Sequence, residues 1–198
     1  MCGIVGYTGP QSASHPLIEG LRRLEYRGYD SAGIALGTPG KLFIEKKAGK
    51  LSNLENALDA SLPNVHSGIG HTRWATHGGP TDGNAHPHVD NDGKLAVIHN
   101  GIIENYTELR SQLEAKGHKF SSETDTESVA HLLSDLRKEH KGDLTGAMRD
   151  AVKALRGSFT LLAIHADTPD VIVGVRRNSP LVVGLGDGEN FMASDVAA

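Results

Sequence analysis

The sequence contains a single cysteine among its 198 residues, and this thiol stands at position 2. One cysteine excludes an intramolecular disulfide and is too few for a zinc site built of thiolates. Such scarcity is typical of proteins from a reducing compartment. We therefore expect a cytoplasmic protein.

Long apolar runs and strong charge are also missing. No stretch approaches the roughly 20 apolar residues of a membrane span, and the N-terminus lacks the basic region and apolar core of a signal peptide. The net charge is -4, so the composition lacks the excess of lysine and arginine that is typical of nucleic-acid-binding proteins. We expect neither a membrane nor a nucleic-acid partner.

Signals for a cofactor or a metal are weak. The sequence has neither a glycine-rich dinucleotide-binding motif nor a P-loop, so no motif indicates a nucleotide cofactor. His86 and His88 flank Pro87, but no third ligand follows at a spacing usual for metal sites. We expect no metal and no cofactor.

The pattern of apolar residues predicts a strand-rich single domain over residues 1–198. Helices are expected from Ser14 to a stop at Gly28, over 105–116, around 129–136 and over 144–155. Strands are expected at 2–8, 31–37, 42–48, 68–75, 94–101, 158–165, 170–176, 181–186 and 190–194. Helices in blocks between runs of strands favour a layered α+β arrangement over alternating βαβ units.

Polar residues before the expected helices predict their caps. Ser14 is expected to cap the first helix, and Asn105 with Glu108 three residues later resembles a capping box. Thr124 or Asp125 is expected to cap the helix around 129–136.

Cys2 lies directly behind the initiator methionine. Because Cys2 is small, Met1 should be removable, which leaves a first residue with both a thiol and a free α-amino group. Such an amine titrates at about 7.7 to 8.0 and a thiol at about 8.5, so the amine can take the thiol proton near neutral pH. An ordinary small residue at a frayed terminus is the alternative, but the apolar run 4–7 predicts a strand that ties the terminus to the core.

Two polar clusters follow the first helix and a strand. Residues 22–33, RRLEYRGYDSAG, join a helix end to a strand, and solvated arginines are the simpler interpretation. Residues 71–81, HTRWATHGGPT, crowd the only tryptophan with polar donors, a density that favours ligand binding. Arg73 matches the planar fork that a carboxylate needs, whereas a surface salt bridge is the alternative.

Two further clusters come later in the chain. In HNGIIENY, residues 99–106, Asn100 and Gly101 offer a side-chain amide and a backbone N–H that suit a developing oxyanion. A type I′ turn is the alternative for an Asn-Gly pair. In SSETDTES, residues 121–128, Asp125 is a candidate for binding a substrate ammonium, with helix capping as its alternative.

Taken together and in this order, the motifs resemble those of the class II glutamine amidotransferases, which are N-terminal-nucleophile hydrolases. The motifs are MCGIVGY at 1–7, LEYRGYDSAG at 24–33, GHTRWATHG at 70–78, NAHPH at 84–88, HNGIIENY at 99–106 and SETDTE at 122–127. The resemblance spans the whole chain. It implies a four-layer α/β/β/α sandwich of two antiparallel sheets between helices.

The resemblance also implies the chemical groups of the site. Cys2 matches the nucleophile, with its α-amino group as the general base, acting through a water. Asn100 and the N–H of Gly101 match the oxyanion hole.

Substrate recognition follows from the same motifs. Arg73, with Thr76 and His77 close by, matches the pocket for the glutamine α-carboxylate, and Asp125 matches the partner of the α-ammonium. Trp74 matches a mobile-loop residue that caps the site and helps to gate ammonia passage. Arg27, in the turn beside the nucleophile, is expected to support the site from outside the substrate pocket.

The activity implied is hydrolysis of L-glutamine to glutamate and ammonia through a γ-glutamyl thioester, with no cofactor. The tyrosine and tryptophan of EYRGYD and HTRWATHG favour the branch of the family that makes amino sugars. Full-length members of that branch continue into a sugar-isomerase domain that binds fructose 6-phosphate, and this domain is absent from the 198 residues. The amidotransferase domain of that branch is also longer, so we expect Ala198 to truncate it.

Two alternatives remain at this stage. The chain resembles, less closely, the glutaminase halves of amidophosphoribosyltransferase and asparagine synthetase, whose relatives carry other residues at the two aromatic positions. A catalytically silent amino-acid-binding or regulatory domain with the same fold is the second alternative. An intact Cys2 together with Asn100 and Gly101 argues against it.

Overall fold

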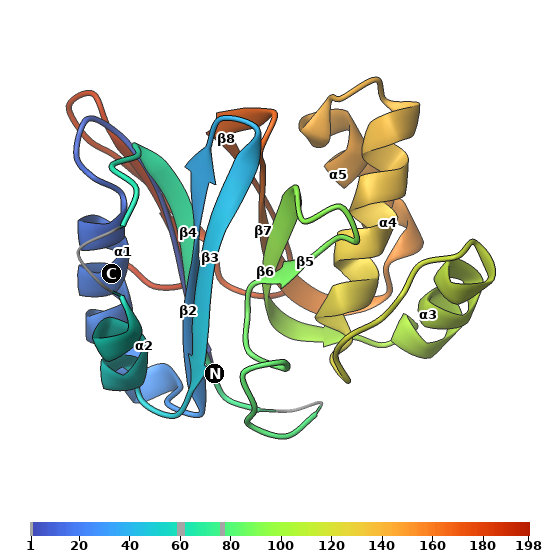
Figure 1. The fold of residues 1–198 in the computed structure, drawn as a ribbon, viewed down its shortest axis with the longest axis horizontal. Coiled ribbons are helices and arrows are strands. Elements are labelled where there is room, and N and C mark those ends of the chain that lie inside the picture. Colours follow the sequence, from blue (N-terminus) through green and yellow to red (C-terminus); the bar gives the residue numbers. More distant parts are fainter. Residues whose placement is uncertain (1, 59–61, 76–77) are drawn as a thin grey trace.

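Two antiparallel sheets lie face to face in the computed structural model, which describes residues 2–58, 62–75 and 78–198 (Figure 1). The larger sheet has the strand order β3-β2-β4-β1-β10-β9. Its strands are β1 (Gly3–Thr8), β2 (Ser31–Thr38), β3 (Lys41–Ala48), β4 (Ser67–Arg73), β9 (Val182–Leu185) and β10 (Asn190–Ala193). The smaller sheet, in the order β5-β6-β7-β8, contains β5 (His88–Val89), β6 (Leu95–Ile103), β7 (Gly157–His165) and β8 (Thr168–Arg177).

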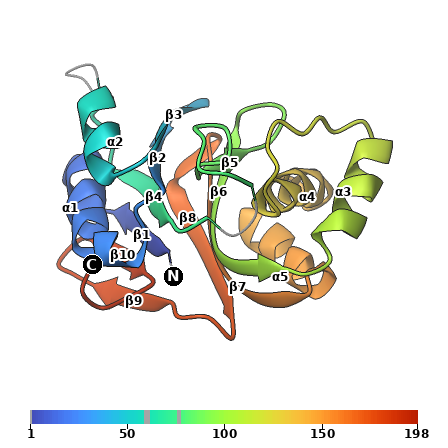
Figure 2. The ribbon, with the colours of Figure 1, turned by 90° about the horizontal axis from the view of Figure 1, so that it is seen from below.

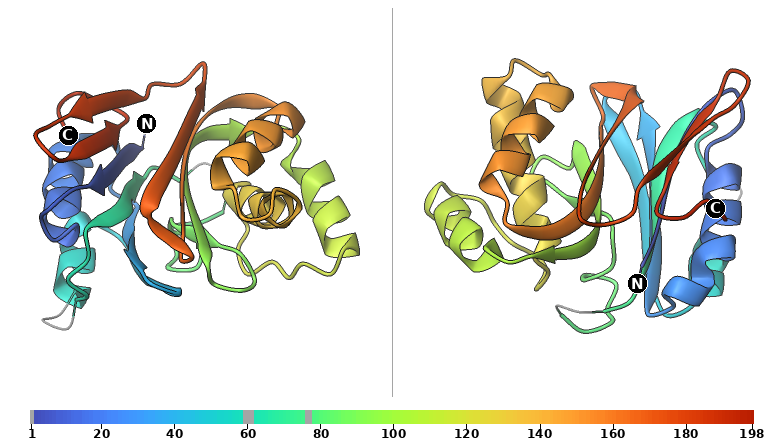
Figure 3. Two further views of the ribbon diagram at one scale, coloured as in Figure 1. Left: turned by 90° about the horizontal axis from the view of Figure 1, so that it is seen from above. Right: turned by 180° about the vertical axis from the view of Figure 1, so that it is seen from behind.

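Helices cover the outer face of each sheet, as Figure 2 shows from below and Figure 3 from above and behind. The larger sheet is covered by α1 (Ser14–Leu24), which a 3-10 turn (Glu25–Arg27) extends, and by α2 (Leu51–Ala57). The smaller sheet is covered by α3 (Tyr106–Ala115), α4 (Thr126–Glu139) and α5 (Leu144–Ala154). This order of layers confirms the predicted α/β/β/α sandwich.

Three apolar cores hold the four layers together. Ile4, Ile69, Ile98 and Leu162 pack between the two sheets. A second core joins the larger sheet to the helices through residues such as Leu17, Leu21 and Leu54. A third lies between the smaller sheet and its helices, and includes Val129, Leu133 and Phe159. Alternate residues of one strand therefore enter different cores, which is why the sequence of these strands is apolar on both faces.

The nine predicted strands are confirmed, with ends that differ by no more than two residues. The strand predicted over 68–75 ends at Arg73, because the backbone nitrogens of Trp74 and Ala75 donate to side chains and not to a neighbouring strand. Helix α2 and strand β5 were not predicted. Both are short, at seven and two residues, so their periodicity is weak.

The predicted caps are wrong in their side-chain contacts. Ser14 is the first residue of α1 and makes no capping hydrogen bond. Asn105 precedes α3, but its amide bonds the carbonyl of Ala154 and the N–H of Arg156, so it ties this loop to the end of α5. Tertiary contacts compete for these polar groups and override the local signal.

No helix among the described residues is long and apolar enough to cross a bilayer.

Candidate active site

A cavity of about 380 Å³ opens between the ends of β1 and β4 and strand β6, and the predicted site residues that the structure describes line it. The larger sheet contributes Cys2, directly before β1, and Arg73, the last residue of β4. The smaller sheet contributes Asn100 and Gly101 from β6, and Asp125 precedes α4. These residues are distant in sequence, and the packing of the two sheets brings them to one cavity of a size usual for a small-molecule site.

The sulfur of Cys2 is held by the backbone of Trp74. The N–H of Trp74 donates to Sγ over 3.1 Å, and the thiol donates to the carbonyl of Trp74 over 3.6 Å. Burial raises the pKa of the Cys2 thiol, while the Trp74 N–H and the charge of Arg73 lower it in part. Cys2 is therefore a thiol near neutral pH, and it needs a base before it can attack.

Asn100 lies inside β6 opposite Thr160, so the predicted alternative of a type I′ turn is wrong. Its Nδ2 donates to the carbonyl of Cys2 over 2.9 Å, which places the carboxamide beside the candidate nucleophile. Gly101 has φ of 111°, and an added Cβ would lie 2.0 Å from the carbonyl oxygen of Ser158. Only glycine fits at this position, and its backbone borders the cavity.

Arg73 is only 3% exposed, so a surface salt bridge is the wrong interpretation. Its guanidinium donates to the carbonyls of Gly78 and Gly79, at 3.3 Å each. Burial lowers the pKa of Arg73, although the Cys2 and Asp125 side chains oppose that shift. An arginine remains charged in proteins, so the cavity holds a buried cation.

The turn after α1 supports this end of β4 through Gly28. A Cβ on Gly28 would lie 2.8 Å from the carbonyl carbon of Arg73 and 3.0 Å from the nitrogen of Trp74. The backbone of Gly28 is extended, with φ of -174°, so glycine is needed here for close approach. Gly28 was predicted to stop the first helix, but α1 ends at Leu24 and Gly28 ends the 3-10 turn that extends it. Gly28 also lets two loops of the site pack together.

Asp125 is buried beside the cavity, and its carboxylate does not cap α4. Its Oδ2 accepts a hydrogen bond of 2.9 Å from the backbone nitrogen of Ile103. The predicted capping role is therefore wrong for Asp125. It is also wrong for Thr124, whose hydroxyl contacts His88 and Ser122.

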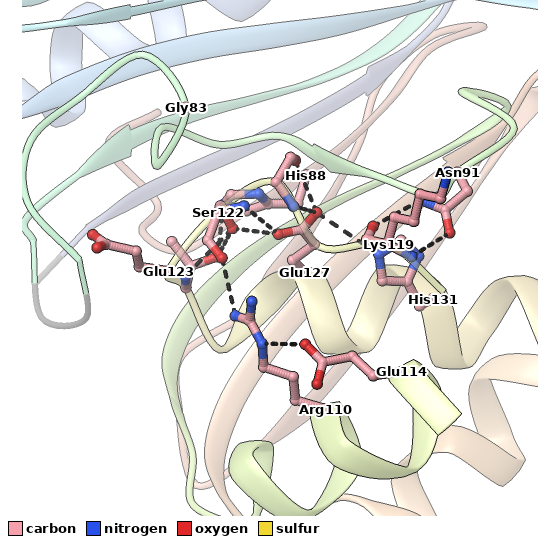
Figure 4. A network of polar contacts seen from close by, with 12 residues as sticks. Gly83, His88, Asn91, Arg110, Glu114, Lys119, Ser122, Glu123, Glu127 and His131 are labelled. Carbon is pink, nitrogen blue, oxygen red and sulfur yellow. Dashed lines mark hydrogen bonds and ion pairs between the residues drawn. The ribbon is translucent and has the colours of Figure 1, made fainter. Parts of the chain in front are cut away.

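The loop before Asp125 is held by the carboxylate of Glu127 (Figure 4). This carboxylate accepts hydrogen bonds from the backbone nitrogen and the hydroxyl of both Ser121 and Ser122, over 2.6 to 2.9 Å. Arg110 adds a bond to the carbonyl of Ser122. Burial alone would raise the pKa of Glu127, but His131 and these donors hold it well below its usual range. An ionised Glu127 thus orients the segment that carries Asp125.

Trp74 and Arg27 border the same cavity. The indole of Trp74 is 47% exposed and meets the ring of Tyr29 edge-on, at 5.6 Å between centroids. Arg27 is buried, and its Nη1 lies 2.7 Å from Oδ2 of Asp195, so it is not a solvated arginine. Thr76 and His77, the other predicted residues of the carboxylate pocket, lie outside the described residues.

A group of buried histidines next to the cavity was not predicted from the sequence. His71 contacts Asn100, and both His86 and His99 contact the hydroxyl of Thr126 at 2.9 Å. His88 contacts Thr124. Burial holds the pKa of His71 and of His88 at about 3, and that of His86 well below 6.5. His71 and His99 lie inside β4 and β6, His88 begins β5, and His86 precedes β5, but a lone histidine in the sequence carries no signal of its partner.

Two other features bear on the sequence predictions. The described residues contain no group of three His, Cys, Asp or Glu side chains placed to hold a metal ion. The turn 178–180 borders the cavity and was not predicted to do so. Its sequence, Asn-Ser-Pro, indicates a turn and gives no sign of its place in the site.

Residues 71–198 match the model of a glutamine amidotransferase domain. The chain is 62% identical, over its whole length, to a glutamine–fructose-6-phosphate aminotransferase (isomerizing) of Streptomyces coelicolor, and 59% identical to one of Thermus thermophilus. It spans 32% of the length of each of these relatives.

Among solved structures, the fold is similar to that of a glutamine phosphoribosylpyrophosphate amidotransferase from B. subtilis, with a TM-score of 0.81 and 28% identity. That match covers 98% of this chain and 42% of the other. The family model matches more than half of the chain, and the fold is that of a glutamine amidotransferase. The chain therefore belongs to the class II glutamine amidotransferase family.

Proposed function

We propose that this chain is the glutaminase domain of a glutamine–fructose-6-phosphate aminotransferase, and that it hydrolyses L-glutamine to glutamate and ammonia. One observation carries the proposal. A single cavity holds the thiol of Cys2, the carboxamide of Asn100, a buried cation at Arg73 and a buried carboxylate at Asp125. Glutamine carries a carboxylate, an ammonium and a carboxamide, so these groups match each part of it by charge and reactivity.

The reaction begins with transfer of the Cys2 thiol proton. Once Met1 is removed, the α-amino group of Cys2 accepts this proton, through a water as in the family. The thiolate then attacks the side-chain carbonyl carbon of glutamine, and its electron pair moves to the carbonyl oxygen. The hydrogen bond from Trp74 to Sγ favours the thiolate and fixes its position.

Asn100 and Gly101 stabilise the resulting oxyanion. One hydrogen on Nδ2 of Asn100 is committed to the carbonyl of Cys2, and the second is the proposed donor to the oxyanion, together with the N–H of Gly101. The α-ammonium returns its proton to the leaving nitrogen, the C–N bond breaks, and ammonia leaves. Water then adds to the γ-glutamyl thioester, releasing glutamate and restoring the thiol.

Arg73 and Asp125 are proposed to orient the substrate. Arg73 pairs with the α-carboxylate, and Asp125 accepts from the α-ammonium. Thr76 and His77 are proposed to complete the carboxylate pocket, Trp74 to cover it, and Arg27 to support the turn beside Cys2. Since Cys2 can attack only while its sulfur is not oxidised, the reaction suits a reducing cytoplasm.

The relatives support a role in making an amino sugar. They are about three times longer than this chain, so we propose that ammonia passes to a sugar-isomerase domain of the same polypeptide, which binds fructose 6-phosphate. Identity of about 60% to the aminotransferases, against 28% to the phosphoribosylpyrophosphate amidotransferase, favours this branch over the amidophosphoribosyltransferase type.

The test is ammonia release from L-glutamine by the chain as it stands, paired with labelling by a diazo-ketone analogue of glutamine. Wild-type protein should release ammonia and take up one label, because Cys2 is its only thiol. Cys2→Ala should abolish both, while it still allows removal of Met1. Ammonia release that survives in Cys2→Ala would overturn the mechanism. A silent amino-acid-binding domain would instead bind glutamine, for example by calorimetry, without releasing ammonia.

A further inference from the structure

A hydrogen bond between His71 and Asn100 connects the two sheets behind the proposed oxyanion hole. His71 lies in β4, where it pairs with Gly33 and Ile4 of the neighbouring strands, and Asn100 lies in β6 of the other sheet. Nε2 of His71 is 2.9 Å from Oδ1 of Asn100, and His71 is fully buried. The ring of His71 therefore occupies a defined place between the sheets.

The direction of this bond follows from the other contact of the same carboxamide. The carbonyl oxygen of Cys2 can only accept, so the atom of Asn100 that faces it, at 2.9 Å, is the amide nitrogen. Oδ1 then faces His71, and a carboxamide oxygen can only accept. His71 must therefore donate, which assigns its hydrogen to Nε2.

The surroundings of His71 keep it neutral and fixed. Burial lowers its pKa to about 3, so the ring carries one hydrogen near neutral pH. Nδ1 is buried and makes no hydrogen bond of standard geometry among the described residues, although the backbone of His99 beside the ring opposes the lowering of the pKa in part. The ring of His86 packs against it, at 4.3 Å between centroids, and opposes rotation. His71 is thus a permanent single donor directed at Oδ1.

We propose that His71 is a positioning residue of the glutaminase reaction: its Nε2–H holds the Asn100 carboxamide so that the amide nitrogen, and not the oxygen, faces the nucleophile and the developing oxyanion. This inference rests on the proposed function. A carboxamide turned by 180° would present its oxygen to the oxyanion and to the Cys2 carbonyl, and both contacts would repel. Donation to Oδ1 also polarises the amide and strengthens its N–H as a donor.

The first experiment compares steady-state glutaminase kinetics of His71→Leu and His71→Gln. Removing a whole oxyanion donor typically costs on the order of 100-fold to 1000-fold in kcat, so loss of its orientation should cost about 10-fold to 100-fold. KM should change by less than about 3-fold, because His71 does not line the cavity. His71→Gln keeps an N–H near the position of Nε2, and should recover most of kcat.

His88→Gln is the matched control. His88 belongs to the same buried histidine group, but it contacts Thr124 and not Asn100. Its replacement should leave kcat within about 2-fold of wild type, since it touches neither donor of the oxyanion hole. A similar loss of kcat in His88→Gln and His71→Leu would mean that any disturbance of the group lowers activity, and would overturn the positioning role.

A double-mutant cycle separates positioning from packing. In an Asn100→Ala background no carboxamide remains to be oriented, so His71→Leu should lower kcat by less than about 2-fold. An undiminished loss in that background would overturn the inference. Should His71→Leu not fold, nitrogen NMR of histidine-labelled wild-type protein remains decisive. The ring resonances assigned to His71, by their loss in His71→Gln, should show a neutral ring protonated at Nε2 from pH 6 to 8. Protonation of His71 at Nδ1 in its place would contradict the proposal.

The outcomes distinguish this inference from the proposed function. Absence of ammonia release by the wild type, or release that does not need Cys2, contradicts the proposed function. Cys2-dependent release with wild-type kcat in His71→Leu contradicts the positioning role alone.

Discussion

The backbone nitrogen of Trp74 lies 3.1 Å from the sulfur of Cys2 and donates a hydrogen bond to it. Trp74 follows the last residue of β4, and Cys2 precedes the first residue of β1, so the bond joins the ends of two adjacent strands. The register of the larger sheet therefore sets the position of the thiol. The α-amino group of Cys2 must also lie at this place for the amine and the thiol to act together.

An extra residue inserted between Met1 and Cys2 should abolish glutaminase activity. The insertion converts the free amine of Cys2 into an amide, which cannot accept the thiol proton, and burial keeps the pKa of that thiol high. Ammonia release measures the effect. As a control, alkylation by iodoacetamide at pH 9 should still modify Cys2, because hydroxide can deprotonate the thiol there. Glutaminase activity at the wild-type level would show that the α-amino group is not the base.

Asn100→Ala should lower kcat by about 100-fold to 1000-fold with a much smaller change in KM, because it removes a donor that acts mainly in the transition state. Initial rates of ammonia release over a range of glutamine concentrations give both constants. If the loss appeared mainly in KM, Asn100 would be a residue for substrate binding and not part of an oxyanion hole.

Asp125→Asn should weaken glutamine binding strongly. The asparagine keeps an oxygen that can accept from the backbone nitrogen of Ile103, but it lacks the charge that pairs with the α-ammonium. Loss of one partner of a desolvated ion pair typically costs about 2 to 5 kcal/mol, or roughly 30-fold to several thousand-fold in affinity. Calorimetry with the inactive Cys2→Ala protein measures this affinity without turnover.

Arg73→Lys tests the other end of the substrate against this result. Lysine retains the charge but not the planar fork, so it should lose part of the affinity for the α-carboxylate. The melting temperature serves as the control for both variants.

Normal binding by Asp125→Asn would show that the carboxylate only orders the backbone near Ile103.

Unfolding should become markedly easier as the pH falls from 7.5 to 5.5. Burial depresses the pKa of His71, His86 and His88, whereas in the unfolded chain each titrates near 6.5. Above pH 6.5 these neutral rings make their full contribution to the free energy of unfolding. This contribution is lost as the pH falls toward their folded pKa values, because only the unfolded chain binds the protons. Three such groups should lower the free energy of unfolding by about 4 kcal/mol over this interval.

Urea unfolding at the two pH values measures this difference. The variant His88→Gln retains a polar partner for Thr124 and should reduce the pH dependence by about one third, since one titrating group is gone. A free energy of unfolding that is the same at both pH values would mean that these rings are protonated in the folded protein.

Most of the fold was predictable from local patterns. Apolar runs identified central strands such as β1, β2 and β4, because these strands are buried on both faces. Helices α1, α3 and α5 showed the 3.6-residue period, since only one face of each is buried. The two elements that were missed, α2 and β5, are too short for either pattern to stand out.

The candidate site was also predictable only in part. The chemical groups were recognisable in the sequence: a lone thiol at position 2, an Asn-Gly pair, an arginine and an acidic residue in specific motifs, because residue type fixes which chemistry a side chain can do. The contacts of those groups depend on the tertiary structure. Asn100 is a strand residue and not a turn, Asp125 holds Ile103 and not its own helix, and His71 reaches Asn100 across the two sheets. Each of these choices depends on which partner lies within about 3 Å, and that distance is set by sheet register and packing between strands far apart in the chain.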